Sequence, residues 1–374
     1  MSFIAIFGTA VGIVSIGLGV SKWFPDQDDH QTVVRIAAGL STNEADSTSG
    51  NMPGIGLYDV MGRKIGSTHG SGWKIKDGDF IDISVPFDDG VGKKPTEYIS
   101  IANGGNDALC IAYLSLTQPD GTKKAWYGDV AKSCEADWYH SQLKIGDDNH
   151  QPACTWIDRN RSNGLRYQGF GLHIDDFGGT WERAKEYNDH RDLPCNAAPR
   201  FKMYEKIQSE DPIPFFSPPL EYSENILTDM DPSAVLDKTR WVLPREGPNI
   251  NKAVVDGDGP KKIRRQEVPQ DQVSAQQSRI FANTVIMSKS PNHSAKELCE
   301  HPQSKGYDFV SLDEQLFCDM NTRMIWPLCS GDKTARCFDQ RNSTMRAGNG
   351  LRGRDTDTGL YPQKKTYGKT VLWD

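Results

Sequence analysis

The feature that most constrains this chain is its set of eight cysteines, an even number divided into two groups of four. The first group lies between residues 110 and 195 and the second between 299 and 337: Cys110, Cys134, Cys154, Cys195, then Cys299, Cys318, Cys329 and Cys337. An even count favours disulfides formed in an oxidising compartment. We expect pairing within each group, for instance Cys299 with Cys318 and Cys329 with Cys337. Each bond would stabilise the fold by about 2–4 kcal/mol.

No metal site and no cofactor are predicted. The C-x₂₋₄-C spacing that structural zinc sites use does not occur in the sequence. Residues 348–353 match the dinucleotide-binding pattern G-x-G-x-x-G literally. That pattern requires a strand before it and a helix after it, but polar residues flank it on both sides.

An uncharged apolar run over residues 3–20 opens the chain, and as a helix it would be about 27 Å long. One interpretation is a secretory signal peptide or signal anchor over residues 1–21, with cleavage near Gly19 or after Ser21. The alternative is a retained helix with a face of small residues that lets helices approach closely in a membrane. This segment would then be the chain's one contact with a membrane.

Three N-glycosylation sequons begin at Asn160, Asn292 and Asn342. Together with the even cysteine count and the apolar start, they favour the secretory route. We therefore expect an extracellular or cell-surface location.

Composition sets the scale and excludes several classes of protein. The 374 residues allow two or three folding units at roughly 150 residues each. A mean hydropathy of −0.60 excludes a protein with many membrane spans. The net charge of −7 and the lack of a basic stripe argue against nucleic acid as a partner.

Short segments with two-residue alternation dominate residues 31–145 and predict an antiparallel β-sandwich domain. We expect strands over residues 79–85, 97–102, 108–116 and 123–129. The segment 108–116 is apolar on both faces, as in a central strand. Gln118-Pro119-Asp120-Gly121 predicts a tight turn. The fold class is therefore mainly β, α+β overall.

The rest of the chain is expected to be less regular. Residues 146–243 form a mixed region packed on the sandwich, with strands over 169–177 and 200–206, a helix over 180–190 and a proline-rich extended strap over 211–222. A polar linker follows over 244–275. A Cys-rich subdomain over 276–345 contains capping boxes at Ser294 and Ser311, each predicting a short helix. Residues 346–374 are expected to be a loosely held tail.

The linker carries two dibasic pairs, Lys261-Lys262 and Arg264-Arg265. An exposed flexible segment is where a processing protease would cut. The alternative is a plain solvated run of charge.

No catalytic motif occurs, but acidic and imidazole side chains lie near aromatic residues. The candidates are Asp129, Asp137, His140, Asp158, His173, Asp175 and Asp176. A pair of carboxylates flanking a cleft would suit glycoside hydrolysis. The alternative is that these are ordinary surface residues of β-sandwich loops.

Five aromatic side chains are candidates for stacking on sugar rings: Trp126, Tyr127, Trp138, Tyr139 and Trp156. The alternative for each is packing in the core or against a disulfide.

Several strings resemble a family of secreted, cysteine-containing fungal proteins of uncharacterised function. They are NDALCIAY (106–113), PDGTKKAWYGD (119–129), CEADWYHSQ (134–142), CTWID (154–158), DPIPFFSPPLEY (211–222), AVLDKTRW (234–241), SLDEQLFCDMN (311–321) and WPLC (326–329). The resemblance covers most of residues 32–340. It implies an extracellular or cell-surface location and disulfides, but no reaction. The chain departs from the family at Glu135, where a glycine is expected after the second cysteine.

The favoured function is non-enzymatic binding or assembly at a cell surface or wall, with cell-wall carbohydrate or further copies of the chain as partners. The first alternative is a secreted hydrolase that uses a carboxylate pair. The second is a toxin or effector whose N-terminal helix assembles in a membrane.

Overall fold

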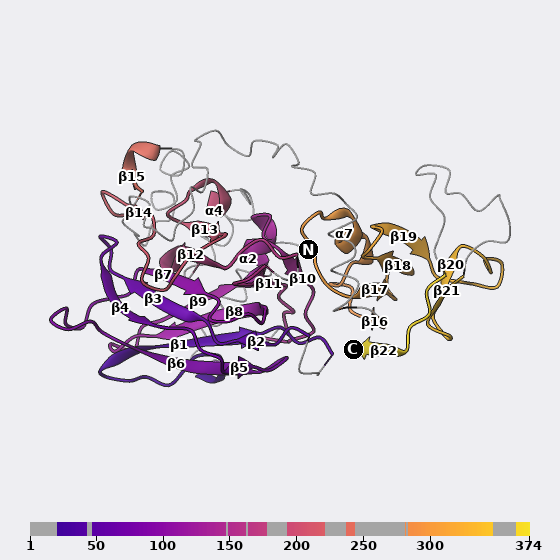
Figure 1. Ribbon diagram of the computed structural model, residues 1–374, viewed down its shortest axis with the longest axis horizontal. Helices are drawn as coiled ribbons and strands as arrows, with labels where there is room; N and C mark the ends of the chain where they lie inside the picture. The colour runs from indigo at the N-terminus through magenta and orange to yellow at the C-terminus, as the bar shows by residue number, and fades with distance from the viewer. Residues whose placement is uncertain are drawn as a thin grey trace. The chain divides into compact units, whose positions relative to one another are not determined.

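The computed structural model describes residues 21–42, 47–146, 149–161, 164–177, 193–220, 237–243, 281, 283–346 and 364–374. The chain divides into two compact units, residues 1–266 and 267–374 (Figure 1). The division falls within the predicted linker over 244–275. That linker, its dibasic pairs and the apolar run over 3–20 lie outside the described residues.

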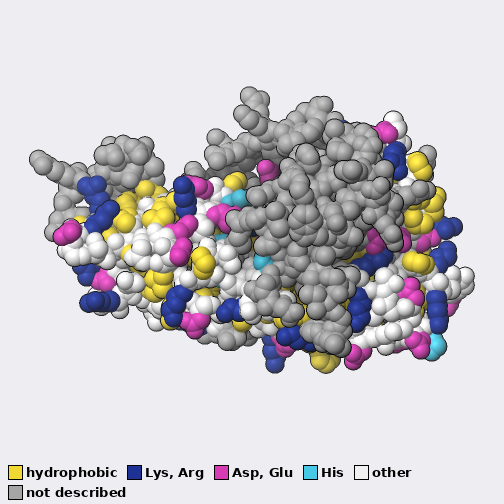
Figure 2. Space-filling model, turned by 180° about the vertical axis from the view of Figure 1, so that it is seen from behind, with side chains coloured by type: hydrophobic (Ala, Val, Ile, Leu, Met, Phe, Trp, Pro, Cys, Tyr) yellow, Lys and Arg dark blue, Asp and Glu magenta, His cyan; other side chains and the backbone are white. Residues whose placement is uncertain are grey.

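The described surface mixes charges of both signs. Figure 2 shows lysine and arginine side chains interspersed with carboxylates on the described part of one face. In the described part of the chain, no helix combines the length and the apolar character needed to cross a bilayer.

The first unit is built on two antiparallel sheets, which confirms the mainly β fold class. The first sheet has the order β10 (Trp138–Tyr139), β11 (Cys154–Ile157), β8 (Leu109–Thr117), β1 (Gln31–Ala38), β6 (Phe80–Pro86), with β9 (Lys123–Tyr127) also paired with β8. The second has the order β13 (Phe201–Tyr204), β12 (Gly169–His173), β7 (Tyr98–Ala102), β3 (Gly54–Tyr58), β4 (Lys64–Thr68).

Short elements complete this unit. Two-residue strands pair at its periphery, β2 (Gly50–Asn51) with β5 (Lys74–Ile75) and β14 (Phe215–Phe216) with β15 (Trp241–Val242). The described helices are η1 (Ser21–Trp23), α2 (Gly128–Ser133), η2 (Ile174–Asp176), α4 (Leu193–Asn196) and η4 (Lys238–Arg240).

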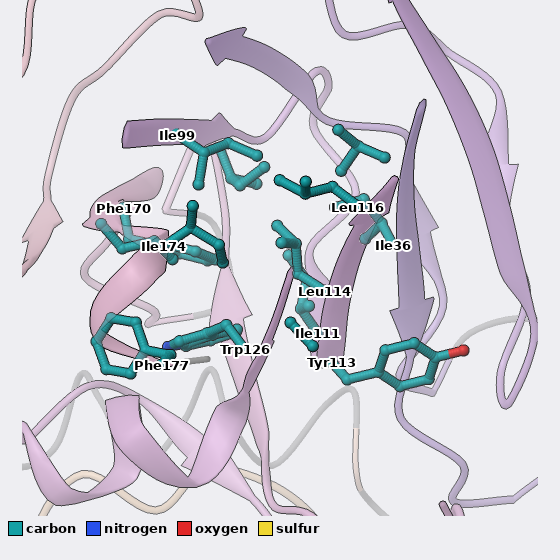
Figure 3. Close-up of a cluster of buried hydrophobic side chains, with 14 of the residues drawn as sticks. Ile36, Ile99, Ile111, Tyr113, Leu114, Leu116, Trp126, Phe170, Ile174 and Phe177 are labelled. Atoms are coloured by element: carbon teal, nitrogen blue, oxygen red, sulfur yellow. The ribbon is translucent and has the colours of Figure 1, made fainter. Parts of the chain in front are cut away.

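Apolar side chains from both sheets form one core (Figure 3). Leu114 of β8 lies opposite Ile36 of β1, and both are fully buried. The ring of Trp126 on β9 packs against Phe170 on β12, with ring centroids 4.8 Å apart. The two sheets are therefore held by side chains that interdigitate across the sandwich.

The central strand β8 is buried on both faces, as its sequence predicts. All nine of its residues are buried. On the outer face, the hydroxyl of Ser115 donates to the carbonyl of Trp23 (2.7 Å), and the hydroxyl of Thr117 donates to that of Pro25 (2.8 Å). The segment that precedes β1 thus covers this face and satisfies its polar groups.

The expected domain boundary at residue 145 is wrong. Strand β11 pairs with β8 in the first sheet, and β12 lies between β7 and β13 in the second. The region 146–243 is therefore part of the sandwich rather than a layer packed on it. Alternation within a strand identifies the strand but does not say which distant strand it pairs with.

Local predictions in this unit are confirmed in part. The turn at residues 118–121 forms, with Gly121 at φ 85°. The strap is extended over its described residues 211–220 and includes β14. The strand predicted over 123–129 ends at Tyr127, where α2 begins. The helix predicted over 180–190 lies outside the described residues.

The second unit contains a five-stranded sheet of mixed direction. Its order is β19 (Met324–Pro327), β18 (Leu316–Asp319), β17 (Asp308–Ser311), β16 (Thr284–Ser288), β22 (Lys369–Trp373). Strand β16 is parallel to both β17 and β22. A hairpin of β20 (Cys337–Asp339) and β21 (Thr344–Arg346) adds Phe338, which stacks on Phe317 with centroids 4.4 Å apart.

The expectation of a loose tail from residue 346 is wrong for residues 364–374. Strand β22 pairs with β16 along five residues, and Trp373 is fully buried. Glycine and charge just before this segment concealed it, because a five-residue edge strand carries little sequence signal. Residues 347–363 lie outside the described part.

One of the two capping-box predictions is confirmed. Ser294 caps α7 (Ala295–Glu300), and its hydroxyl accepts the backbone N–H of Glu297 at 2.9 Å. The helix predicted at Ser311 is wrong, because residues 312–315 form the turn between β17 and β18.

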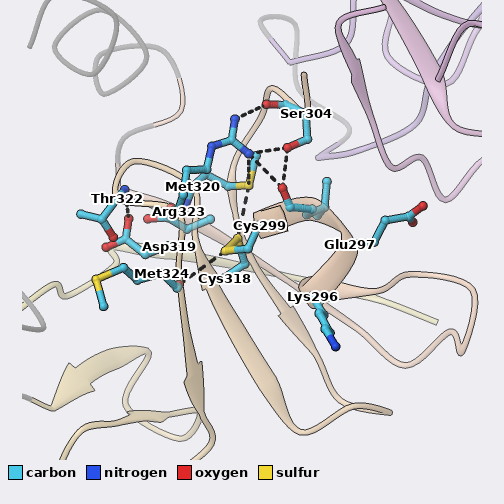
Figure 4. Close-up of a disulfide and its surroundings, with 12 residues drawn as sticks. Lys296, Glu297, Cys299, Ser304, Cys318, Asp319, Met320, Thr322, Arg323 and Met324 are labelled. Atoms are coloured by element: carbon cyan, nitrogen blue, oxygen red, sulfur yellow. Dashed lines mark hydrogen bonds between the residues drawn. A yellow bond between two sulfur atoms is a disulfide. The ribbon is translucent and has the colours of Figure 1, made fainter. Parts of the chain in front are cut away.

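All eight cysteines are paired, and every disulfide lies within one unit. The bonds are Cys110–Cys154, Cys134–Cys195, Cys299–Cys318 and Cys329–Cys337. This confirms pairing within each group, including both pairs named from the sequence. The Cys299–Cys318 bond joins α7 to β18 beside Arg323 (Figure 4).

Candidate functional site

A pocket of about 330 Å³ in the second unit is the clearest candidate site among the described residues. This volume lies in the range of pockets that hold one small organic molecule. Its lining combines apolar and polar groups: Phe281, Asn283, Gly306, Asp308, Met320, Asn321, Lys364, Lys365, Thr366 and Tyr367. The aromatic rings and the thioether offer apolar contact, while the amides, hydroxyl, carboxylate and ammonium groups offer hydrogen bonds.

A charged cluster forms one wall of this pocket. The ammonium of Lys365 contacts Asp308 Oδ2 at 3.0 Å and Asp319 Oδ1 at 2.5 Å. The hydroxyl of Tyr367 donates to Asp308, whose Oδ1 accepts the backbone N–H of Met320 at 2.7 Å. This cluster holds its side chains in one arrangement before any ligand arrives.

The pKa values of the cluster follow from burial and charge. Burial, together with the nearby carboxylate of Asp319, raises the pKa of Asp308. Burial opposes the charged form of Lys365, but Asp308 and Asp319 outweigh it and raise the pKa of that ammonium group. Lys365 therefore stays protonated at neutral pH.

The parallel pairing of β22 with β16 positions the residues before β22. The backbone N–H of Gly368 donates to Asn283 Oδ1 at 2.7 Å, just before β16. On the other side, Tyr367 donates its N–H to the carbonyl of Ser343 at 3.0 Å, and Met345 donates to that of Lys365 at 2.8 Å. The segment 364–367, which the sequence predicts to be part of a loose tail, thus supplies four lining residues.

A second cluster lies in the first unit and contains two of the predicted catalytic candidates, His173 and Asp175. They meet Glu97, just before β7, and Lys124 of β9. The ammonium of Lys124 contacts Asp175 Oδ1 at 2.5 Å and Glu97 Oε2 at 3.8 Å. His173 Nε2 lies 4.0 Å from Glu97 Oε2.

The two carboxyl groups of this second cluster share a hydrogen bond. Burial and the nearby Asp175 raise the pKa of Glu97 to about 8. Burial also disfavours ionised Asp175, but its hydrogen bond with Glu97 and the charge of Lys124 lower its pKa. Glycosidases separate their two carboxyls by about 5–9.5 Å so that a sugar or water fits between them. This pair is too close for that arrangement.

Three of the remaining catalytic candidates contact other partners, at different places in the first unit. Asp129 Oδ2 lies 3.0 Å from His150 Nε2, and Asp137 accepts the backbone N–H of Arg166 at 2.7 Å. Asp158 accepts the backbone N–H of Asn160 at 3.3 Å.

Two further candidates are buried side chains. The ring of His140 packs edge-on against Trp138, with centroids 5.2 Å apart. Asp176 Oδ2 lies 3.0 Å from His173 Nδ1. Among the catalytic candidates, His173, Asp175 and Asp176 therefore lie together in the described part of the chain.

The five predicted stacking aromatics are all buried, so they do not present a ring face for stacking. Their exposed fractions are at most 3%, for Trp126, Tyr127, Trp138, Tyr139 and Trp156. They instead follow the alternative interpretation, in which these side chains pack in the core or against a disulfide. Sequence reasoning passed over Trp73, which is 77% exposed just before β5.

Two of the three sequon asparagines, Asn160 and Asn342, are exposed, and Asn292 is half-buried. Asn160 follows β11, and Asn342 lies in the turn between β20 and β21. Both exposed amides are therefore at positions that a glycosyltransferase could reach in the folded chain.

Sequence reasoning also missed Glu97, Lys124, Asp308, Lys365 and Tyr367. Glu97 and Lys124 each begin or lie within a predicted strand, where a charged residue is expected to face solvent. Among these charged residues, Asp308 alone lies between aromatic neighbours in the sequence, Tyr307 and Phe309, so the sequence carried little signal for this set. No protein-family model matches this chain, and no curated protein sequence matches it.

Proposed function

We propose that this chain is an extracellular, non-enzymatic binding protein that holds a small saccharide unit in the pocket of its second unit. The observation that carries the proposal is the pocket of about 330 Å³ that combines an aromatic wall with hydrogen-bonding groups. A sugar ring has apolar faces and hydroxyl groups along its edges. It therefore requires both kinds of contact within one small space.

The polar groups of the pocket suit hydroxyl ligands. Asn321 and Lys364 are exposed at the pocket, and Asp308 presents a half-buried carboxylate held by Lys365 and Tyr367. Lysine donates hydrogen bonds, a carboxylate accepts them, and an amide does both. A hydroxyl also does both, so each lining group has a complementary partner on a sugar.

The four disulfides support the extracellular part of the proposal. Bonds of this kind persist in oxidising compartments and are rare where thioredoxin and glutathione keep thiols reduced. The exposed sequons at Asn160 and Asn342 are compatible with passage through the secretory route. A cell surface or wall would supply saccharide at high local concentration.

The experiment is a glycan array probed with the full chain and with two lysine variants. Lys364→Ala removes a pocket-lining ammonium group, and Lys333→Ala removes an exposed lysine of the same unit that does not line the pocket. We expect the wild type and Lys333→Ala to bind the same saccharides, and Lys364→Ala to bind them at least about 5-fold more weakly. An array without signal, or equal signals for the two variants, contradicts the proposal.

A further inference from the structure

We propose that Glu97, His173 and Asp175 form a binding site for a divalent transition metal of the Zn²⁺ type at one end of the sandwich. One ligand atom from each side chain lies within 4.8 Å of the other two. The site is separate from the saccharide pocket and does not rest on it.

The spacing of the three atoms is close to that of a metal site. Zinc binds imidazole nitrogen and carboxylate oxygen at about 2.0–2.2 Å, which places tetrahedral ligand atoms about 3.4 Å apart. His173 Nε2 and Glu97 Oε2 are 4.0 Å apart. Small side-chain rotations therefore bring the ligands to bonding distance without movement of the strands.

The orientation of His173 matches that of metal-binding histidines. Its Nδ1 lies 3.0 Å from Asp176 Oδ2, and Asp176 Oδ1 in turn accepts a hydrogen bond from Arg200 Nη1 at 3.1 Å. Metal-binding histidines commonly donate one ring N–H to a carboxylate, which directs the other nitrogen at the metal. Here that arrangement directs Nε2 towards the side of Glu97.

The three ligands lie at the ends of paired strands: His173 is the last residue of β12, Glu97 precedes β7, and Asp175 lies in η2 directly after β12. His173 lies opposite Tyr98 in the register of β12 and β7, so Glu97 lies beside the end of β12. The backbone N–H of Ile174 donates to the carbonyl of Glu97 at 2.9 Å, which ties the segment of Asp175 to that of Glu97. Ligands attached to the ends of sheet elements keep their geometry better than ligands on long loops.

A positive charge already occupies part of this site. Lys124 contacts both carboxylates and also donates to the carbonyl of Thr96 at 2.8 Å. Because the pKa of Glu97 is raised to about 8, the hydrogen-bonded pair of Glu97 and Asp175 carries one negative charge at neutral pH, and the ammonium of Lys124 balances it. A divalent cation would displace the proton of Glu97, balance both carboxylates and add the imidazole as a ligand, so Lys124 competes with the metal.

The donor set selects the class of metal. One imidazole nitrogen and two carboxylate oxygens suit Zn²⁺ and its neighbours in the first transition row. Ca²⁺ and Mg²⁺ prefer oxygen ligands alone and bind such a site weakly.

The test is calorimetric titration of the full chain, freed of metal by dialysis against a chelator, with Zn²⁺ and with Mg²⁺. We expect one Zn²⁺ per chain and at least about 10-fold weaker binding in His173→Gln and Glu97→Gln. His150→Gln is the matched control, because His150 is also buried against a carboxylate, Asp129, but lies outside the cluster. Its affinity for Zn²⁺ should equal that of the wild type.

Lys124→Met separates a metal site from a purely structural ion network. If the cluster is a metal site, removal of the competing ammonium should tighten Zn²⁺ binding. If it is only a structural ion network, the substitution should not increase the affinity for Zn²⁺. Cobalt absorption by the wild type provides a readout that needs no variant, because Co²⁺ bound in place of Zn²⁺ in a site of this kind gives strong visible bands. The proposal would be overturned if neither Zn²⁺ binding nor these bands were observed. It would also be overturned if His173→Gln and His150→Gln lost Zn²⁺ affinity equally, or if Lys124→Met bound Zn²⁺ more weakly than the wild type.

Discussion

Glu135 adopts a left-handed backbone conformation, with φ of 59°, directly after the disulfide-bonded Cys134. Its carbonyl accepts a hydrogen bond from Arg166 Nη2 at 2.8 Å, which links this turn to the segment that contains Arg166. A side chain with a Cβ pays a steric penalty in this region that glycine avoids.

We predict that Glu135→Gly raises the stability of the first unit by about 0.5–1 kcal/mol. Lys132→Gly is the control, because Lys132 lies within α2, where glycine costs about 1 kcal/mol. Urea unfolding of both variants measures the difference. A loss of stability in Glu135→Gly would show that contacts of the glutamate side chain outweigh the backbone strain.

Asp339 stabilises the folded second unit through its charge. Hydrogen bonds, first from the side chain of Asn342 and then from Arg346 and backbone N–H groups, lower its pKa to about 2. The folded-state pKa lies below the usual 3.8, so this contribution is complete above pH 3.8 and disappears as the pH falls through 2.

We therefore expect Asp339→Asn to destabilise the second unit by about 1–2 kcal/mol at pH 7 and by much less near pH 2. Unfolding by urea at both pH values measures it. Asp332→Asn, at an exposed position in the same unit, serves as the control and should change stability little. A loss in Asp339→Asn that does not depend on pH would exclude the charge as its cause.

At the scale of elements, three consecutive hairpins of the second unit share one loop design. Ser311 pairs with Leu316, Asp319 with Met324 and Asp339 with Thr344, so each loop contains four residues. The last loop residue has positive φ in every case, at Gln315, Arg323 and Ser343. The residue directly before each loop, Ser311, Asp319 or Asp339, accepts backbone N–H groups of the loop through its side-chain oxygen.

This design explains why the second capping box was misread. The hydroxyl of Ser311 accepts the N–H of Glu314 at 3.2 Å, as the hydroxyl of a helix cap does. The chain then turns back at Gln315 instead of continuing as a helix. A Ser-x-x-Glu pattern specifies the hydrogen bond, but a turn and a helix both contain that bond.

Glu314 instead caps the neighbouring helix. Its carboxylate accepts the hydroxyl of Ser294 at 2.5 Å and the backbone N–H of Lys296 at 3.1 Å. We predict that Glu314→Ala lowers the stability of the second unit by about 1 kcal/mol. Glu300→Ala is the control, because its pair with Lys296 is 61% exposed on both sides and contributes little. Equal effects of the two variants would contradict the capping role.

Strands were more predictable than the candidate sites. Period-two alternation identified β6, β7 and β12, and a short apolar run between turn signals identified β8, which is buried on both faces. The site residues are the exceptions to that pattern. Lys124, for example, lies in β9 with an exposed residue before it and buried residues after it, and only the folded chain shows that Glu97 and Asp175 surround its ammonium.

At the scale of the whole molecule, each unit has its own core and its own disulfides. The cluster around Trp126 and Phe170 belongs to the first unit, and that around Phe317 and Phe338 to the second. The cysteine partition predicted this division correctly, because bonds within a unit require their cysteines in one part of the sequence. The extent of the sandwich and the integration of β22 depend on pairing between distant segments, which composition does not reveal.

The division predicts separate responses to loss of a disulfide. The Cys134–Cys195 bond closes 61 residues, and chain entropy assigns it about 4 kcal/mol; Cys329–Cys337 closes 8 residues and is assigned about 2.5 kcal/mol. In calorimetric melts, replacing Cys134 and Cys195 by serine should lower only the transition of the first unit. Replacing Cys329 and Cys337 should lower only that of the second. A shift of both transitions in either variant would mean that the two units unfold together.

Calorimetric titration with a soluble oligosaccharide from the array tests whether the pocket of the second unit binds saccharide. Phe281→Ala removes an aromatic wall of the pocket, and Trp73→Ala removes the exposed tryptophan of the first unit. We expect at least about 10-fold weaker binding in Phe281→Ala and unchanged binding in Trp73→Ala. Loss of binding in Trp73→Ala with full binding in Phe281→Ala would contradict it.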